Sequence, residues 1–157
     1  MIRGIHHVAL HTVDLPRIVE FYRDVVGFKE VARHGWENSE ITDRVVGLSK
    51  SAAQVVMLRA GNCYLEIFKY AAPKPRPAAP LRACDHGYTH LCLDVTDIHG
   101  EYQRLVAAGM TFNTPPGDFG DIRAAYGRDP DGNIVEIQET LPGQVFAMSR
   151  LGAPRFD

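Results

Sequence analysis

Apolar and polar residues alternate over residues 4–12, the pattern of a β-strand with one covered face. Asp14 and Pro16 then mark the start of a helix, which Gly27 is placed to end. Between them, apolar side chains recur at the helical spacing of three and four, at Ile18, Phe21, Tyr22, Val25 and Val26. Three further apolar runs follow, near residues 28–33, 52–59 and 63–70. The first half of the chain therefore predicts the order β-α-β-β-β.

The second half of the chain repeats this order of elements. A strand is predicted near residues 87–95, and a helix from Asp97 to about Ala108. Three apolar runs follow near residues 110–113, 121–127 and 133–139, and the turn signal Asp129-Pro130-Asp131-Gly132-Asn133 joins the last two. We therefore expect an α+β fold in which two βαβββ modules, in a pseudo-twofold arrangement, form a curved mixed sheet around a cavity.

A proline-rich stretch separates the two modules. Its prolines disfavour both helix and sheet pairing and favour an extended linker; they are Pro73, Pro75, Pro77 and Pro80. The predicted organisation is a first module over residues 1–70, a linker over 71–85, a second module over 86–140 and a C-terminal extension over 141–157. The extension shows no clear pattern, which is typical of a tail or of a segment that docks elsewhere.

The two modules share short motifs at equivalent places. Four residues near the start of the first module recur 83 residues later: His7, Leu10, Asp14 and Leu15 correspond to His90, Leu93, Asp97 and Ile98. Near the end of each module a Gly-Asn pair is followed by apolar residues and Glu-Ile, which puts Glu66 and Glu136 at matching positions. The modules therefore begin and end alike, and a shorter internal loop explains the smaller second module.

Alternation along the strands shows which side chains share a face with each repeated His and Glu. The ionisable residues lie opposite the side that carries most of the aliphatic residues: His7 goes with Ala9 and His11, His90 with Cys92 and Asp94, Glu66 with Tyr64 and Phe68, and Glu136 with Ile134 and Gln138. If the modules pair symmetrically, two imidazoles and two carboxylates converge. His7, Glu66, His90 and Glu136 then form a site for one divalent ion, with positions left open for water and substrate. Nickel, cobalt, manganese, iron and zinc all accept such ligands.

Four further residues are candidates for contacting a substrate in this cavity. His11 and Asp94 each lie four residues beyond a repeated histidine, and a buried hydrogen-bonded pair is the alternative role for them. Tyr126 lies ten residues before Glu136, and Arg123 could hold a carboxylate or phenolate by paired hydrogen bonds. A solvent-facing arginine beside a turn is the plainer interpretation of Arg123.

The amino-acid composition limits which kinds of molecule this protein is expected to bind. Seventeen Lys and Arg against nineteen Asp and Glu give a formal charge of −2, without a run of like charge, so neither nucleic acid nor an anionic membrane is an expected partner. No apolar stretch approaches the roughly 18 residues of a spanning helix, and the N-terminus has no secretory pattern. The three cysteines have no CxxC spacing, which indicates neither a disulfide framework nor a zinc knuckle. We expect a soluble protein of the cytoplasm.

The opening sequence IHHVALHTVDLPRIVEFYRDVVGF and the closing sequence YGRDPDGNIVEIQE resemble the vicinal oxygen chelate superfamily, over roughly residues 4–140. This superfamily includes glyoxalase I, extradiol dioxygenases and bleomycin-resistance proteins. The resemblance implies metal ligands on the first and last strands of each module, again His7, Glu66, His90 and Glu136. It also implies a metal that chelates neighbouring substrate oxygens, and a homodimer, in some members with each site built from two chains. In glyoxalase I one ligand glutamate doubles as the base, which puts that role on Glu66 or Glu136.

Three functions follow from the resemblance. The first is a metal-dependent, glyoxalase-like lyase or isomerase acting on a small oxygen-rich metabolite through an enolate-type intermediate. The second is an Fe(II)-dependent extradiol dioxygenase that uses His7, His90 and Glu136, and the third is a metal-free binding protein like those of bleomycin resistance. Glyoxalase I enzymes usually carry Arg where this chain has His11, so lactoylglutathione is not the expected substrate. The substrate is expected to depend on the loops at 34–50 and 113–121.

Overall fold

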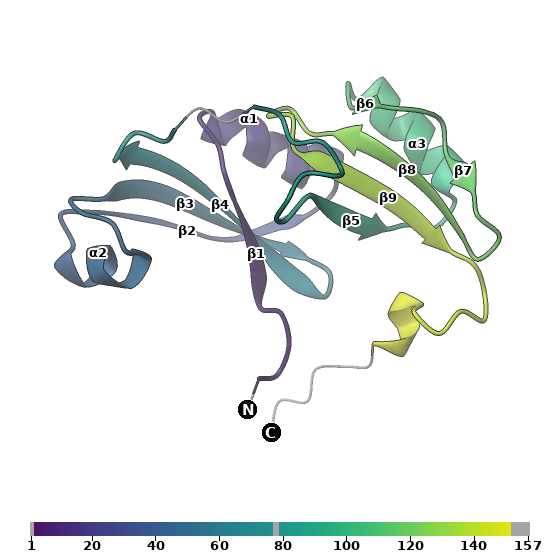
Figure 1. Ribbon diagram of the computed structural model, residues 1–157, viewed down its shortest axis with the longest axis horizontal. Helices are drawn as coiled ribbons and strands as arrows, with labels where there is room; N and C mark the ends of the chain where they lie inside the picture. Colours follow the sequence, from purple (N-terminus) through teal and green to yellow (C-terminus); the bar gives the residue numbers. More distant parts are fainter. Residues whose placement is uncertain (1, 77–78, 152–157) are drawn as a thin grey trace. The chain divides into compact units, whose positions relative to one another are not determined.

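The strands of the chain form two sheets, one in each of two units. The computed structural model describes residues 2–76 and 79–151 (Figure 1). One unit is Gly4–Ala78, and the other is Ala79–Asp157 with Met1–Arg3; we call them the first and second modules. Each module contains the predicted β-α-β-β-β order, which confirms the α+β class.

The first module holds a four-stranded sheet in the order β1-β4-β3-β2. β1 and β4 are parallel, whereas β4, β3 and β2 pair antiparallel. The elements are β1 (His7–His11), α1 (Leu15–Glu20), η1 (Phe21–Val25), β2 (Lys29–Glu37), α2 (Glu40–Val46), β3 (Ala52–Ala60) and β4 (Cys63–Ala72). The parallel pair brings the first and last strands of the module together, as the repeat requires.

The core of the first module lies between α1, η1 and one face of this sheet. Alternate residues of the two central strands are fully or almost fully buried there: Val56 and Leu58 on β3, and Leu65 and Ile67 on β4. Ile18 and Tyr22 from the helical segment are also fully buried. Each pair of core residues flanks a residue that points to the other face, and on β4 this residue is Glu66.

The first helical segment differs in detail from the single helix predicted from the sequence. Asp14 caps it by accepting a hydrogen bond from the Arg17 N–H at 3.3 Å. The α-helix then gives way to the π-helix η1, in which the Val26 N–H bonds to the Phe21 carbonyl. This wider turn accompanies burial of the adjacent rings of Phe21 and Tyr22, and Gly27 ends the segment at a positive φ of 96°.

The region 34–50, expected to be a loop, contains the end of β2 and the helix α2. α2 joins the ends of β2 and β3 (Figure 1). Ser39 caps its start, and Gly47, at φ 69°, ends it. None of its residues is buried, so it lacks the apolar stripe that identifies a helix in sequence. The carboxylate of Asp43 anchors it to the sheet by accepting hydrogen bonds from the N–H groups of Lys50 (2.7 Å) and Ser51 (2.8 Å).

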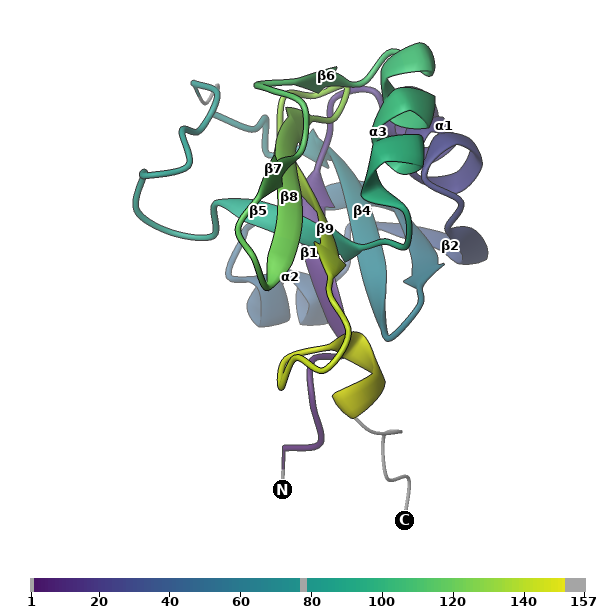
Figure 2. The same ribbon diagram turned by 90° about the vertical axis from the view of Figure 1, so that its right-hand side faces the viewer.

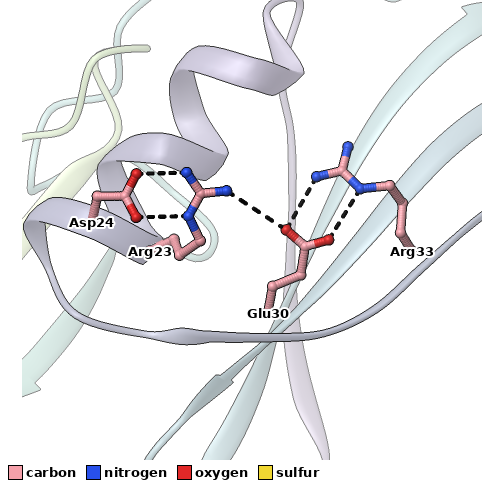
Figure 3. A network of polar contacts seen from close by, with 4 residues as sticks. All are labelled: Arg23, Asp24, Glu30 and Arg33. Carbon is pink, nitrogen blue, oxygen red and sulfur yellow. Dashed lines mark hydrogen bonds and ion pairs between the residues drawn. The ribbon is translucent and has the colours of Figure 1, made fainter.

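A chain of exposed charges connects η1 to β2 (Figure 3). Arg23 pairs with its neighbour Asp24 and approaches Glu30 at 3.9 Å, and Glu30 forms two hydrogen bonds of 3.1 Å with Arg33. The Arg33 hydrogen bond holds the pKa of Glu30 below its usual range. Because these groups are exposed, screening by solvent leaves them a small contribution to stability.

The second module holds a five-stranded sheet in the order β5-β9-β8-β6, with β7 also paired to β8. β5 lies parallel to β9, as β1 does to β4. The elements are β5 (His90–Asp94), α3 (Ile98–Ala107), β6 (Thr111–Phe112), β7 (Gly117–Asp118), β8 (Ile122–Arg128), β9 (Ile134–Thr140) and η2 (Met148–Arg150). The strand β7, in the expected loop at 113–121, is an addition to the sequence prediction.

α3 packs beside β8 and β9 (Figure 2). Ile98 and Leu105 on the helix are buried together with Val135 and Ile137 on β9. The predicted turn before β9 is confirmed, because the buried Asp129 accepts hydrogen bonds at 2.8 Å from the backbone and side-chain N–H groups of Asn133. Glu136 lies between the two core residues of β9 and therefore points to the opposite face.

Two predicted segments fall partly outside the described residues. These are the linker, where Pro77 is not described, and the C-terminal extension, where residues 152–157 are not described. Within the described extension, the Gln144 side chain donates a hydrogen bond to Asp121 at 2.9 Å. In the part of the chain that the structure describes, no helix has the length and apolar character needed to cross a membrane.

Asp43 makes the stability of the first module depend on acidity. The Ser51 hydroxyl and the Ser51 and Lys50 N–H groups lower the pKa of Asp43. Its stabilising contribution is therefore present above the unfolded pKa of about 4 and is lost as the pH falls through the lower folded value. We expect the free energy of unfolding, measured in urea, to decline less below pH 4 for Asp43→Asn than for the unmodified chain.

Glu37→Gln, at the exposed end of β2, is the control for removing a carboxylate near α2. Its acid dependence should follow that of the unmodified chain. Equal acid dependence of all three proteins would contradict the role given to Asp43.

Candidate metal centre

In the first module, parallel pairing brings His7 and Glu66 together. His7 is paired with Tyr64, and Glu66 lies two residues further along β4 on the same face. The His7 Nε2 and Glu66 Oε2 atoms are 3.2 Å apart. The other ring nitrogen of His7 lies 2.9 Å from the Nδ1 atom of His6, so both nitrogens of the ring have a neighbour.

The second module repeats this arrangement with His90 and Glu136. His90 is paired with Ile134, and Glu136 again lies two residues further along the last strand. The His90 Nε2 and Glu136 Oε2 atoms are 3.1 Å apart. The Thr89 hydroxyl lies 2.9 Å from His90 Nδ1. The repeat seen in the sequence thus corresponds to two similar His–Glu pairs, one in each module.

The donor atoms of each pair fit a divalent ion. Imidazole nitrogen and carboxylate oxygen bind such ions at about 2.1 Å, and two ligands in adjacent octahedral positions at that distance lie about 3.0 Å apart. The observed distances of 3.2 and 3.1 Å are close to this value. A contact to the second ring nitrogen is also typical of histidines that bind metals. The same distances suit a hydrogen bond, so each pair is arranged to share either a proton or an ion.

Each His–Glu pair lies within one module. Within residues 2–76 and 79–151, no three or more His, Cys, Asp or Glu side chains form a group that could hold a metal ion. The site of four ligands therefore stays a prediction that requires both modules.

Besides His90, Glu136 has two further polar neighbours. Tyr126 on β8 and Cys92 on β5 are the two residues paired with Glu136, so both lie on its face of the sheet. Burial and the Glu136 carboxylate raise the pKa of Tyr126 to about 12 and that of Cys92 to about 12. Both groups are therefore neutral donors at physiological pH. The ring of Tyr126 also contacts His90, with centroids 5.2 Å apart.

His11 and Asp94 lie on the strand faces predicted for them, those of His7 and His90. The Nε2 atom of His11 is buried and has no hydrogen-bond partner among the described residues, and its ring lies beside that of Tyr70. Burial raises the pKa of Asp94. The sequence interpretation missed Tyr70, although its position four residues after Glu66 on the same strand places it on the same face.

Arg123 lies on the face of β8 opposite Tyr126 and Glu136. It is paired with Glu139, three register positions from the Tyr126–Glu136 pair, and an odd number of positions along a strand changes the face. Its guanidinium lies 3.2 Å from both Asp118 and Glu139. Glu139 in turn accepts a hydrogen bond from the Asp97 N–H at the start of α3. Arg123 therefore links β7, β8 and β9, and this position does not support the predicted substrate contact.

The fold and these pairs can be compared with known proteins. The family model Glyoxalase/Bleomycin resistance protein/Dioxygenase superfamily matches residues 4–137. The chain therefore belongs to this superfamily, which confirms the resemblance noted in its opening and closing sequences.

Two similar proteins are enzymes by name. A 2-epi-5-epi-valiolone epimerase from an Actinomyces species is 35% identical over 156 residues, covering 91% of this chain and 82% of that protein. A probable lactoylglutathione lyase from Synechocystis is 23% identical over 136 residues, covering 85% and 93%.

Solved structures share the fold. A glyoxalase family protein from Bacillus cereus has a TM-score of 0.78 at 22% identity, with coverage of 90% of this chain and 95% of that one. The trypanothione-dependent glyoxalase I of Leishmania major has a TM-score of 0.61 at 19% identity, with coverage of 87% and 86%.

A structural role for Arg123 has a distinct salt dependence. Arg123→Gln leaves the carboxylates of Asp118 and Glu139 without their ion pairs, so we expect a lower urea midpoint at low ionic strength. Salt screens such exposed pairs, so the difference from the unmodified chain should shrink in 1 M sodium chloride. An unchanged midpoint at low salt would show that these ion pairs do not support the fold.

Proposed function

We propose that this chain is a divalent-metal-dependent lyase or isomerase that moves a proton beside a carbonyl group of a small oxygen-rich substrate. The observation that carries the proposal is the similarity of the two His–Glu pairs, with Nε2–Oε2 distances of 3.2 and 3.1 Å. Two such pairs provide the nitrogen and oxygen ligands of one ion and leave positions free for substrate. The epimerase and the probable lyase among the similar proteins support this reaction class.

His7, Glu66, His90 and Glu136 would hold the ion. A divalent ion bound there supplies Lewis acidity, which polarises a carbonyl and stabilises negative charge on its oxygen. The protein's part is to orient the substrate and to move the proton. It removes a proton from the carbon that bears a hydroxyl group next to the carbonyl, and then returns it to the substrate. No oxidant is needed, because the electron pair left on the carbon is shared with the carbonyl oxygen until the proton returns.

Glu136 and Glu66 differ in their surroundings, and this difference assigns metal binding to one and proton transfer to the other. Glu136 is 9% exposed and lies between its register partners Tyr126 and Cys92, a confined position that suits a carboxylate held as a ligand. Glu66 is 14% exposed and forms its ion pair with His7. Glu66 is thus the more accessible of the two carboxylates, and it shares its face of the sheet with the imidazole nitrogen of His11 that has no partner among the described residues. We therefore assign the role of base to Glu66.

His11 provides a polar contact for the substrate beside this base. Its buried Nε2 atom has no protein partner in the described structure, and a buried polar atom without a partner is costly. A substrate hydroxyl or carbonyl could satisfy it. Asp94 has the equivalent position in the second module, and Tyr126 lies on the same face, paired with Glu136.

The proposal extends to the oligomeric state and the cellular compartment of the protein. We propose a homodimer in the cytoplasm, since superfamily members often dimerise. Cys63, Cys84 and Cys92 are free thiols, which is consistent with a reducing compartment.

Hydrogen–deuterium exchange tests the proposed proton transfer. Two α-hydroxyketones serve as probes: dihydroxyacetone, which is acyclic, and scyllo-inosose, a pentahydroxycyclohexanone. With protein loaded with Mn²⁺, Ni²⁺ or Zn²⁺ in D₂O, we expect deuterium at the carbon beside the carbonyl, measured by mass spectrometry. Glu66→Gln should lower the exchange rate by roughly 10²- to 10⁴-fold, the usual value of a general base.

The metal affinities of the two glutamate variants distinguish their roles. Glu136→Gln should weaken metal binding, measured by calorimetry, more than Glu66→Gln does. Exchange that is absent in the unmodified protein with every metal, or unchanged in Glu66→Gln, would contradict the assignment.

A ring-cleaving dioxygenase is the second candidate, and Tyr126 is the observation that favours it. It is paired with Glu136 across the strands and its ring contacts His90, and these are two of the three ligands that such an enzyme would use. His7 would be the third ligand, and iron would be the metal. Oxygen uptake with catechol by the Fe(II)-loaded protein distinguishes this function, because proton transfer consumes no oxygen.

A further inference from the structure

Three aromatic side chains lie together on the face of the first sheet that bears Glu66. Trp36 comes from β2, and Phe68 and Tyr70 follow Glu66 at alternate positions of β4. The ring centroids are 6.1 Å apart for Trp36 and Phe68, and 5.7 Å apart for Trp36 and Tyr70. Phe68 and Tyr70 stack at 5.7 Å. All three side chains are partly exposed. We call these three residues the ring wall.

A small residue allows the rings to approach across a strand. Ala53 on β3 is paired with Trp36 on one side and with Tyr70 on the other. Its methyl group is buried and too short to separate the two rings, which meet edge to face above it. A longer side chain at this position would hold the rings apart.

The indole of Trp36 is fixed by a chain of hydrogen bonds. Its Nε1–H donates to the Ser51 hydroxyl at 2.8 Å, and that hydroxyl donates to the Asp43 carboxylate. Ser51 is fully buried, so its hydroxyl cannot turn to water instead. Asp43 also accepts the Lys50 and Ser51 N–H groups, which holds the carboxylate in place. The orientation of the indole is therefore set by α2, the helix that carries Asp43.

The ring wall lies on the same face as Glu66 and His11, the polar groups that we assign to the reaction. Glu66 and Tyr70 lie four residues apart on β4 and therefore point to the same face of the sheet. Burial, and after it the charge of Glu66, raises the pKa of Tyr70. On the other side of Tyr70 lies the ring of His11, at 6.0 Å. Base, unsatisfied imidazole nitrogen and aromatic surface thus occupy one face of one sheet.

A face that combines aromatic rings with polar groups fits a particular kind of ligand. Aromatic faces are negative, so they attract the weakly positive C–H bonds of an apolar ring face. Groups at the rim of such a ring remain free for polar partners such as His11 and Glu66. A six-membered ring with hydroxyl groups at its rim offers both surfaces, whereas a short acyclic ketone offers too little surface to cover the wall.

We propose that the ring wall, held by Ser51 and Asp43, binds the C–H face of a cyclic polyhydroxyketone and thereby selects the substrate. The inference rests on the proposed function of Glu66 as the base. Ser51 and Asp43 act as positioning residues, because they touch the indole and not the substrate.

Trp36 is the only tryptophan of the chain, so its fluorescence reports binding at the wall directly. The probe is scyllo-inosose, and dihydroxyacetone is the acyclic comparison, each titrated into the full-length protein loaded with Zn²⁺. We expect a saturable change in emission with scyllo-inosose and only a linear, unsaturated change with dihydroxyacetone. Equal saturation by the two ketones would overturn the proposal.

Ser51→Ala tests the positioning role. Loss of one hydrogen-bond acceptor should weaken scyllo-inosose binding about fivefold and lower the fluorescence anisotropy of Trp36, because the indole gains freedom. The effect on exchange should appear in KM rather than in kcat. Thr42→Val is the matched control, since the Thr42 hydroxyl bonds to Ser39, the residue that caps the same helix, and not to Trp36. Wild-type affinity and anisotropy in Ser51→Ala would contradict the role.

A second variant keeps the test independent of Ser51. Tyr70→Leu removes a partly exposed ring and should weaken scyllo-inosose binding at least as much as Ser51→Ala does. If Tyr70→Leu binds as tightly as the unmodified protein, the ring wall is not the binding surface. Saturable binding without any deuterium exchange would instead refute the proposed proton transfer and leave the ring wall standing.

Discussion

In each module the first strand lies parallel to the last, and this pairing determines where the His–Glu pair lies. It brings His7 next to Glu66 and His90 next to Glu136, residues that are far apart in the chain. Parallel strands cannot be joined by a tight turn, so the helix and two further strands of each module lie between them. The helix covers one face of its sheet with apolar side chains. The His–Glu pair is thereby left on the other face, where it remains partly accessible.

Much of this arrangement could be predicted from the sequence. The repeat aligned His7 with His90 and Glu66 with Glu136, and strand alternation assigned all four to the faces observed, because residues two apart share a face whatever the loops do. The α2 helix could not be found by apolar periodicity, since it buries none of its residues. Only its caps, Ser39 and Gly47, gave a local signal. The π-helix η1 also has no signature in a pattern based on helical spacing.

The candidate substrate contacts show where sequence reasoning stops. Arg123 and Tyr126 are three residues apart on one strand, so alternation alone puts them on opposite faces. The structure then shows that Arg123 bonds to Asp118 and Glu139. The link from Asp43 through Ser51 to Trp36 depends on how α2 folds back on the sheet, and no local pattern encodes that contact. The two modules thus share similar His–Glu pairs, whereas only the first shows this hydrogen-bonded ring wall among the described residues.

Metal content is the most direct test of the central claim that the two His–Glu pairs serve one ion. Protein purified without chelators or a metal-affinity step should contain about one divalent ion per chain by mass spectrometry. The double variant His7→Ala/Glu136→Ala breaks both pairs and should lose it. The control His34→Ala/Glu37→Ala removes the same residue types from the exposed end of β2 and should retain it. Metal content that is equally low in all three proteins, and that added divalent ions do not restore, would contradict the account.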